Sequence, residues 1–310
     1  MSTDLPEPVP PLEIVAATET GVSRGARPAV GRLLVLAATL FWSTNGVFAK
    51  ADVFADWPVD ERGTLLAFWR ALFAGALLAT LVREPSWDRR LLPMALAFTG
   101  MNLAFLKSIV MTTAANAIWL QSTSPLWAFC YGLVLRHDRF DRRDSWPLAC
   151  GLAGTLTILV CEWSAPNSDA QRFGVVAGLV SGVLYAAVVV SMRRLRGLDT
   201  AWLVAVNHLT AAALLAPYCL VNGPYPSGWQ WPALILFGCL QMGVPYFLFA
   251  CGLRHITSQE AVGIGLLEPV LSPIWVYLLY AEQPAWWTLA GGGLILVGLV
   301  ARYAVLRRAA

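Results

Sequence analysis

Ten apolar stretches, each about as long as a membrane-crossing helix, constrain this chain more than any other feature. A helix needs about 20 consecutive apolar residues to cross roughly 30 Å of hydrocarbon, and turn-forming residues divide the chain at about that interval. Backbone polar groups have no water to bond in hydrocarbon, so segments of this length are expected to cross as helices. The stretches are 33–51, 64–82, 92–111, 114–135, 146–162, 174–192, 201–221, 231–251, 259–280 and 286–306.

The composition supports a membrane protein. The chain is 57% hydrophobic and 13% charged, whereas about 25% of the residues of a soluble domain are charged. The formal net charge is only +3, which gives no basis for a nucleic-acid partner. We expect the lipid bilayer and a small-molecule substrate as partners, with no cofactor and no metal ion.

The basic residues alternate between the two sides that the ten stretches define. Seventeen of the 22 Lys and Arg fall on one side, and short Arg-rich loops stay in the cytoplasm. The sequence therefore predicts an all-α membrane protein with ten transmembrane helices and both termini cytoplasmic, in the bacterial inner membrane. The seventeen are Arg24, Arg27, Arg32, Arg83, Arg89, Arg90, Arg136, Arg139, Arg142, Arg143, Arg193, Arg194, Arg196, Arg254, Arg302, Arg307 and Arg308.

The chain also contains an internal repeat. A shift of 144 residues superimposes several identities across different stretches, and a nearly constant shift indicates duplication. Five helices per repeat is an odd number, so the second repeat must enter the membrane inverted, as in many secondary transporters. We divide the chain into a disordered cytoplasmic tail (1–30) and two five-helix repeats (31–165 and 170–310). The matched pairs are Thr113 and Thr257, Ala117 and Ala261, Pro125 and Pro269, and Asp138 and Glu282.

The repeated motifs resemble those of the drug/metabolite transporter superfamily, EamA type, over residues 33–306. Asp138 stands where a Glu is more usual, and the sixth stretch has Tyr185 where the first has Trp42. The resemblance implies ten helices around a central cavity and export of small metabolites, with the bacterial aromatic amino acid exporters as the nearest branch. The residues that carry it are Trp42, Lys50, Arg70, Pro125, Asp138, Leu267, Glu268, Pro269 and Glu282.

Polar and aromatic side chains within the stretches mark a candidate substrate site. Aromatic rings suit the apolar part of an amphipathic solute and amides its polar part. Packing between helices is the alternative for each residue taken singly. The candidates, chosen for their helical spacing, are Trp42, Asn45, Met101, Asn102, Phe105, Trp119, Tyr185, Gln241, Tyr246 and Glu268.

Arg70, Lys107 and Glu268 are charged residues within the stretches, where a centred charge costs about 2.5–3.5 kcal/mol on insertion scales. Glu268 either lines the cavity, where it could carry a proton, or makes a packing hydrogen bond beside Pro269. Arg70 and Lys107 are expected near the periplasmic ends of their helices. There, long basic side chains can reach the interface without binding a substrate.

We interpret the chain as a secondary transporter, not an enzyme, that exports small amphipathic metabolites by alternating access. Aromatic or other amino acids are the expected substrates. One alternative is a multidrug exporter of cationic compounds, which a cavity-facing Glu268 would favour. Another is a membrane-embedded enzyme that modifies lipids, although His137, His208 and His255 are too scattered for a catalytic cluster. We expect a monomer, with a dimer as the alternative.

The predicted topology can be tested by labelling single cysteines in a variant that lacks the six native ones. Cysteines at Asp138 and Asp199 should react only from the cytoplasm, and those at Asn167 and Pro226 only from the periplasm. The split of basic residues is the physical reason. Labelling of position 138 from the periplasm would contradict the ten-helix topology.

Overall fold

The computed structural model describes residues 27–134, 145–195 and 197–309, in which the chain forms helices and no strands. The predicted tail and Asp138 lie largely outside this part, although α1 already starts at Pro28, inside the range 1–30. The helices are α1 (Pro28–Ser43), α2 (Asn45–Ala49), α3 (Val59–Ala79), α4 (Leu91–Met111), α5 (Ala114–Gln121), α6 (Ser124–Val134), α7 (Ser145–Ser164), α8 (Asp169–Arg194), α9 (Thr200–Val221), α10 (Gln230–Gly238), α11 (Val244–Gly252), α12 (Ser258–Gly265), α13 (Glu268–Tyr280) and α14 (Trp286–Ala309).

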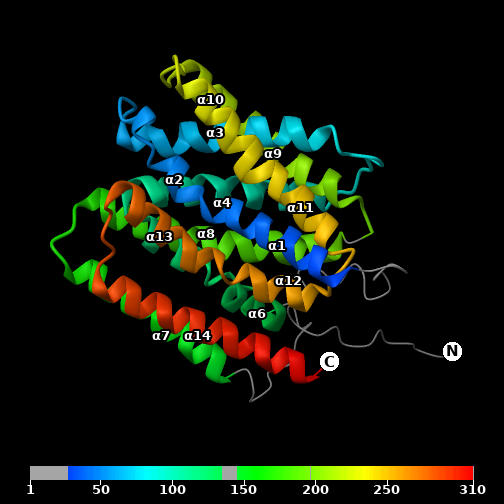
Figure 1. The fold of residues 1–310 in the computed structure, drawn as a ribbon. Coiled ribbons are helices and arrows are strands. Elements are labelled where there is room, and N and C mark those ends of the chain that lie inside the picture. The colour runs from blue at the N-terminus through cyan, green and yellow to red at the C-terminus, as the bar shows by residue number, and fades with distance from the viewer. Residues whose placement is uncertain (1–26, 135–144, 196, 310) are drawn as a thin grey trace.

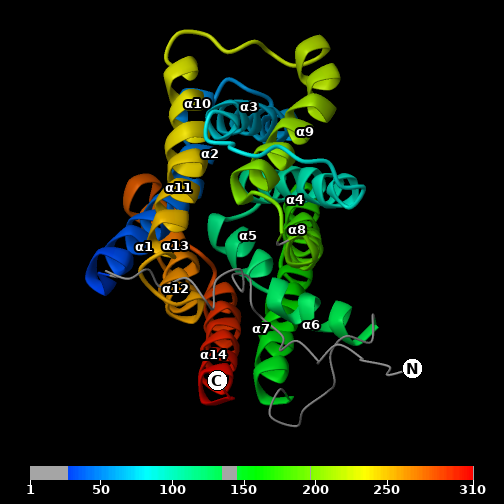
Figure 2. The same ribbon diagram turned by 90° about the vertical axis from the view of Figure 1, so that its right-hand side faces the viewer.

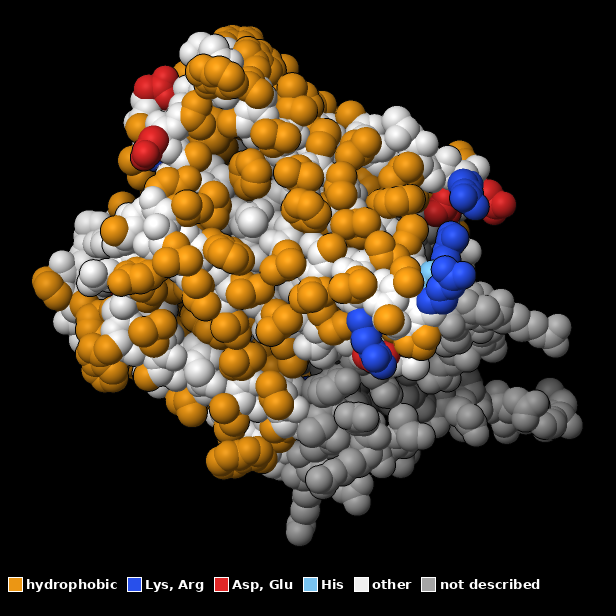
Figure 3. Space-filling model, viewed as in Figure 1, with side chains coloured by type: hydrophobic (Ala, Val, Ile, Leu, Met, Phe, Trp, Pro, Cys, Tyr) orange, Lys and Arg blue, Asp and Glu red, His pale blue; other side chains and the backbone are white. Residues whose placement is uncertain are grey.

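Within the described ranges, eight helical segments are long and apolar enough to cross a membrane. They are α1 with α2, α3, α4, α7, α8, α9, α10 with α11, and α12 with α13. The apolar part of α14 is shorter (Trp286–Arg302), and the fourth predicted stretch forms two short helices, α5 and α6. Hydrophobic side chains cover most of the face in Figure 3, and basic side chains gather along its right edge. The protein is therefore a multi-pass membrane protein.

Two helices that the sequence predicted as continuous, 114–135 and 259–280, are interrupted at equivalent positions. Proline lacks an N–H, and its ring collides with the carbonyl four residues earlier. Pro125 lies four residues after the end of α5 at Gln121, and Pro269 lies four residues after the end of α12 at Gly265. The same shift of 144 residues separates the two breaks, as it separates the prolines. The paired breaks therefore belong to the duplicated sequence.

The helices before these breaks also start alike. Thr113 caps α5 by accepting a hydrogen bond from the Asn116 backbone N–H at 3.1 Å. Thr257 caps α12 by accepting from the Glu260 N–H at 3.3 Å. A threonine hydroxyl satisfies one of the unpaired N–H groups at a helix start. The matched Thr113 and Thr257 thus have the same structural role in both halves.

Two further interruptions have no counterpart in the other half. Between α1 and α2, the hydroxyls of Ser43 and Thr44 donate to Leu40 O (2.7 Å) and Phe41 O (2.6 Å), and such local bonds compete with the helix. Between α10 and α11, a π-helical turn (Cys239–Gly243) precedes Pro245. Turns of this kind often occur at functional sites.

Helices of one half pack against equivalent helices of the other. In Figures 1 and 2, α7 lies along α14 and α3 lies along α9. The pairing of α4 with α8 is matched by that of α11 with α1. This reciprocal pattern is expected of two halves related by a two-fold rotation.

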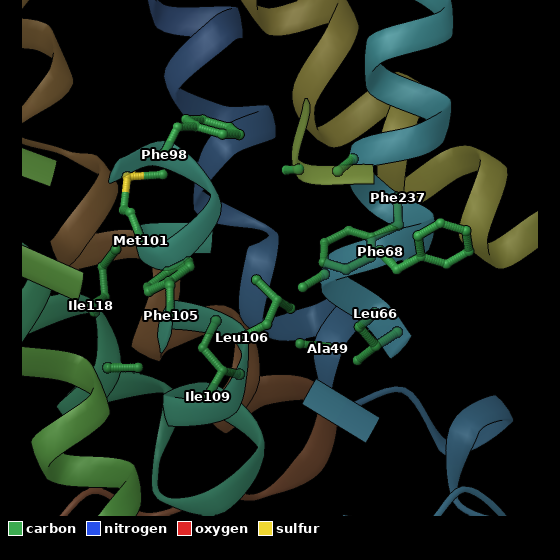
Figure 4. Packing of buried hydrophobic residues seen from close by; sticks show 14 of the residues in the cluster. Ala49, Leu66, Phe68, Phe98, Met101, Phe105, Leu106, Ile109, Ile118 and Phe237 are labelled. Atoms are coloured by element: carbon green, nitrogen blue, oxygen red, sulfur yellow. The ribbon is translucent and has the colours of Figure 1, made fainter. Parts of the chain in front are cut away.

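A continuous packed core joins α3, α4 and α5 to helices of the second half. Figure 4 shows Phe98, Met101 and Phe105 projecting from α4 into this core, with Phe237 of α10 beside Phe68 of α3. Close packing of side chains is a main source of helix association in lipid. The core therefore fixes the positions of the helices that carry the candidate site.

The contact between α7 and α14 depends on glycine. A Cβ atom on Gly154 would lie 2.3 Å from Gly291 O, and one on Gly291 would lie 2.7 Å from Gly154 O. Side chains at these positions would push the two backbones apart, so the small residues permit the close approach. Gly154 and Gly291 thus pack against each other within the chain.

We predict that Gly154→Ala lowers the free energy of unfolding by roughly 1–3 kcal/mol, because the added methyl overpacks a backbone contact. The thermal unfolding midpoint in detergent, followed by tryptophan fluorescence, measures this. Gly151→Ala is the matched control on the same helix, since its Cβ would meet nothing within 4 Å. Equal midpoints for the two variants would contradict the close approach of α7 and α14.

Candidate substrate site

Glu268 lies at the break between α12 and α13, as the first residue of α13. Its side chain is surrounded by protein but partly exposed, and it interacts electrostatically with Tyr185 and Tyr246. These three residues come from α8, α11 and α13. The structure therefore brings together three of the predicted site residues from separate helices of the second half.

Tyr246 also belongs to an aromatic group. The Trp42 ring lies 5.3 Å from the rings of both Tyr246 and Phe249, measured between centroids. Trp42, Tyr246 and Phe249 are partly exposed, and Tyr185 is 37% exposed. We name Trp42, Tyr185, Tyr246, Phe249 and Glu268 the Glu268 cluster. It combines ring faces with one carboxylate, the groups that suit an amphipathic solute.

Gln241 supports this cluster from the π-helical turn between α10 and α11. Its Nε2 donates to Trp42 O at 3.1 Å, while its buried Oε1 has no hydrogen-bond partner among the described residues. The bond joins the end of α1 to the turn between α10 and α11. Gln241 thus positions Trp42, and its free oxygen can accept one more hydrogen bond.

Asn102 and Arg70 form a separate buried pair. The Arg70 guanidinium donates to Asn102 Oδ1, and Asn102 Nδ2 donates to Ala67 O at 2.9 Å. The guanidinium also stacks 5.2 Å from the Phe237 ring centroid. Both ends of the Asn102 amide are therefore used within the protein, which favours a positioning role for Asn102.

The interfacial location expected for Arg70 is wrong. Arg70 is 2% exposed and lies in the middle of α3, because Asn102 and Phe237 supply an acceptor and a ring face inside the bundle. Lys107 does lie near a helix end, where its Nζ is 3.4 Å from Asp60 O. The sequence did not reveal which face of α3 turns inward.

The other predicted site residues lie outside the Glu268 cluster. Met101 and Phe105 belong to the packed core. Asn45 accepts a hydrogen bond from Ser272 Oγ at 3.1 Å. Trp119 is buried against Gly292, where a Cβ would come within 2.4 Å of the indole. A substrate role for these four remains a prediction.

A network around Lys50 joins the two halves at one end of the bundle. The Lys50 ammonium forms an ion pair with Glu282 and donates to Thr112 O at 2.8 Å. Glu282 Oε1 also accepts from the Ala114 backbone N–H at 2.8 Å, at the start of α5. A carboxylate at a helix N-terminus is favoured by the helix dipole. The Lys50 network therefore holds α2, α5 and the loop before α14 together.

A second network at the same end centres on Glu162, which sequence reasoning missed. Glu162 Oε1 accepts from Asn116 Nδ2 (2.9 Å) and from Trp287 Nε1 (3.0 Å). Thr288 Oγ1 donates to Asn116 Oδ1 at 2.7 Å. Asn116 and Glu162 belong to the first half, and Trp287 and Thr288 to the second. A buried acid at the end of a span was the available signal, but its partners are distant in sequence.

Both halves of the chain match one known family. The model of the EamA-like transporter family matches residues 29–160 and again residues 172–303. The chain belongs to the EamA-like transporter family. The double match confirms the duplication and the resemblance to EamA-type drug/metabolite transporters.

Relatives of this family member include proteins named as transporters. It is 30% identical over 275 residues to an uncharacterized transporter of Archaeoglobus fulgidus, covering 87% of this chain and 95% of that protein. It is 26% identical over 277 residues to the pseudopaline exporter CntI of Pseudomonas aeruginosa, covering 87% and 94%. A crystal structure with 21% identity aligns at a TM-score of 0.61 over 91% of this chain and all of that chain, which supports the fold.

We predict that Asn102→Ala lowers the free energy of unfolding by roughly 1.5–3 kcal/mol, because the Arg70 guanidinium loses its side-chain acceptor in a dry interior. The thermal midpoint in detergent measures this. The double variant Arg70→Met/Asn102→Leu should lose less than the sum of the single variants. Asn222→Ala, at an exposed helix end, is the control.

A different result would assign Asn102 to substrate binding. In that case Asn102→Ala would lower transport while the thermal midpoint stayed at the wild-type value. The hydrogen bond between Asn102 and Arg70 would then not stabilise the fold.

Proposed function

We propose that this EamA-like protein is a secondary transporter of the bacterial inner membrane that exports small amphipathic metabolites by alternating access. The observation that carries the proposal is the pair of equivalent helix breaks beside Pro125 and Pro269, one in each repeat. Interrupted helices at corresponding positions of two repeats are the best pointer to a transporter's binding site.

The proposed topology has ten spans, inverted repeats and cytoplasmic termini. The eight long spans, the broken pair α5 and α6, and α14 make up the ten. Basic side chains gather along the right edge of Figure 3, which is the side on which α1 begins and α11 ends in Figure 1. The positive-inside rule assigns this side to the cytoplasm. The Lys50 end is then periplasmic.

Alternating access is supported by the contacts between the halves. The Lys50 and Glu162 networks join the first half to the second at the proposed periplasmic end. Outward release of a solute requires these bonds to open, while the breaks near Pro125 and Pro269 let short helices move without bending long ones. Hinges at the ends of elements are a usual means of such motion.

The proposed substrates are amino acids with aromatic or other bulky side chains. Trp42, Tyr246 and Phe249 offer ring faces that are not fully packed. Aromatic contacts of this kind are worth about 0.5–1.5 kcal/mol each beyond area burial. The relative from Pseudomonas aeruginosa is named as a pseudopaline exporter, which supports export as the direction.

Efflux of cationic amphipathic compounds is the second candidate, and the placement of Glu268 favours it. Glu268 is partly exposed beside aromatic rings and makes no packing hydrogen bond within the described residues. A lipid-modifying enzyme has less support: His208 is buried against Phe98, and His255 lies next to the start of α1. His137 is outside the described residues.

We predict that Trp42→Ala lowers transport of phenylalanine by purified protein in liposomes by roughly 3- to 30-fold, because contacts to two rings and to the solute are lost. Uptake of labelled amino acids into vesicles measures this. Trp163→Ala is the matched control, since Trp163 is exposed at the end of α7. Comparable loss in both variants would argue against a solute contact at Trp42. No transport of any amino acid or cationic amphiphile by the wild type would overturn the proposed function.

A further inference from the structure

Glu268 is an acid inside the bundle that forms no ion pair with any basic residue the structure describes. Among the described residues, the ion pairs are Arg32–Glu260, Lys50–Glu282, Arg90–Asp88 and Arg172–Asp169, and none involves Glu268. A charged group within a membrane protein normally has a partner or a functional role. An ionised Glu268 carboxylate therefore lacks a counter-charge among the described residues.

Arg70 does not supply that charge. Its guanidinium donates to Asn102 and stacks on Phe237, and Tyr246 interacts with both Arg70 and Glu268. Arg70 therefore has its partners on α4 and α10, and it forms no ion pair with Glu268 among the described residues. Glu268 keeps exposed surface of its own, to which a solute can bind without displacing Arg70.

The start of α13 balances only part of the charge on a Glu268 carboxylate. Glu268 is the first residue of the helix, where the helix dipole acts as roughly half a positive charge. Pro269 follows directly and has no N–H to donate. The carboxylate therefore keeps net negative character and unfilled acceptor sites.

The aromatic residues around this acid also suit a cation. Tyr185 and Tyr246 lie close enough to Glu268 to interact electrostatically, and Trp42 contacts Tyr246. The faces of Tyr and Trp rings attract ammonium groups, with a strength of about 2 kcal/mol or more when the groups are desolvated. A carboxylate with several rings recognises a cationic nitrogen.

We propose that the Glu268 cluster is the binding site for a positively charged amino group of the transported solute, with Glu268 as its counter-charge. The inference rests on the proposed function and narrows its substrates to amines, including zwitterionic amino acids and organic cations. Solutes of the same shape that lack a cationic nitrogen are poor substrates. A solute can bind the Glu268 carboxylate without breaking a hydrogen bond, because that carboxylate makes none with the described residues.

Binding of four related compounds to the full-length protein in detergent tests this. Phenylalanine and phenethylamine carry the amino group, whereas 3-phenylpropionate and N-acetylphenylalanine lack a cationic nitrogen. Isothermal titration calorimetry measures each dissociation constant. The wild type should bind the two amines roughly 10- to 100-fold more tightly, the range of a hydrogen bond to a charged group.

Glu268→Gln should abolish this preference, because the amide keeps the size of the side chain and removes its charge. Glu260→Gln is the matched control, since Glu260 pairs with Arg32 at the end of the bundle. If the Gln variant does not fold, Glu268→Asp, which keeps the charge on a shorter side chain, should retain the preference at reduced affinity.

Several results would overturn the inference while leaving the proposed function intact. These are an unchanged preference in Glu268→Gln, no preference in a wild type that transports these solutes, or loss of the preference in Glu268→Asp as well. A Gln variant that keeps the preference but loses its response to an imposed pH gradient would make Glu268 a proton carrier instead. A wild type that neither binds nor transports any compound would instead refute the proposed function.

Discussion

The need to pair every backbone polar group inside hydrocarbon determines most of this structure. It makes each apolar stretch a helix, so any place where a helix stops within the bundle needs a local cause. Pro125 and Pro269 supply that cause, and the chain ends α5 and α12 four residues before them. The breaks therefore stand where irregular backbone is tolerated, inside the protein and next to polar side chains. The candidate site follows from the same constraint, because Glu268 begins the helix after one break.

Charged groups within the bundle are handled in different ways. Lys50 and Glu282 pair at one end, where water is close, and share a further bond with the start of α5. Arg70 is placed deeper, with a carboxamide and a ring face for its guanidinium. Glu268 has neither arrangement. Charged groups whose hydrogen bonds are made within the protein stabilise one conformation. A charged group without such partners remains available to bind a solute. This contrast separates the structural residues from the proposed substrate site better than residue type alone.

Much of the architecture could be predicted from patterns along the chain, whereas the partnerships could not. The lengths of the apolar stretches indicated the helices. The nearly constant shift between matched residues, such as Thr113 and Thr257, indicated the duplication. The match of Pro125 with Pro269 showed that the two positions are equivalent. It did not show that a helix ends before each of them. Contacts such as Lys50 with Glu282 depend on how helices rotate about their axes, which periodicity leaves open in segments that are apolar all round. For the same reason Arg70 was placed at the interface, and the pattern did not show that Met101 and Phe105 belong to the packed core.

The difference between the two halves at the breaks has an energetic consequence. Glu268 occupies the position that Ser124 holds in the first half, because 144 residues separate them. If two inverted halves were identical in sequence, the inward-open and outward-open conformers of such a carrier would be related by a two-fold rotation and would have equal free energy. Each unmatched residue removes that degeneracy, and every 1.4 kcal/mol of difference changes the population ratio tenfold. The empty carrier would then rest mainly in one conformer, and the cation that neutralises Glu268 would have to shift this ratio by its unequal affinity for the two. In a carrier that works by the proposed alternating access, divergence between the repeats would thus set the resting conformer.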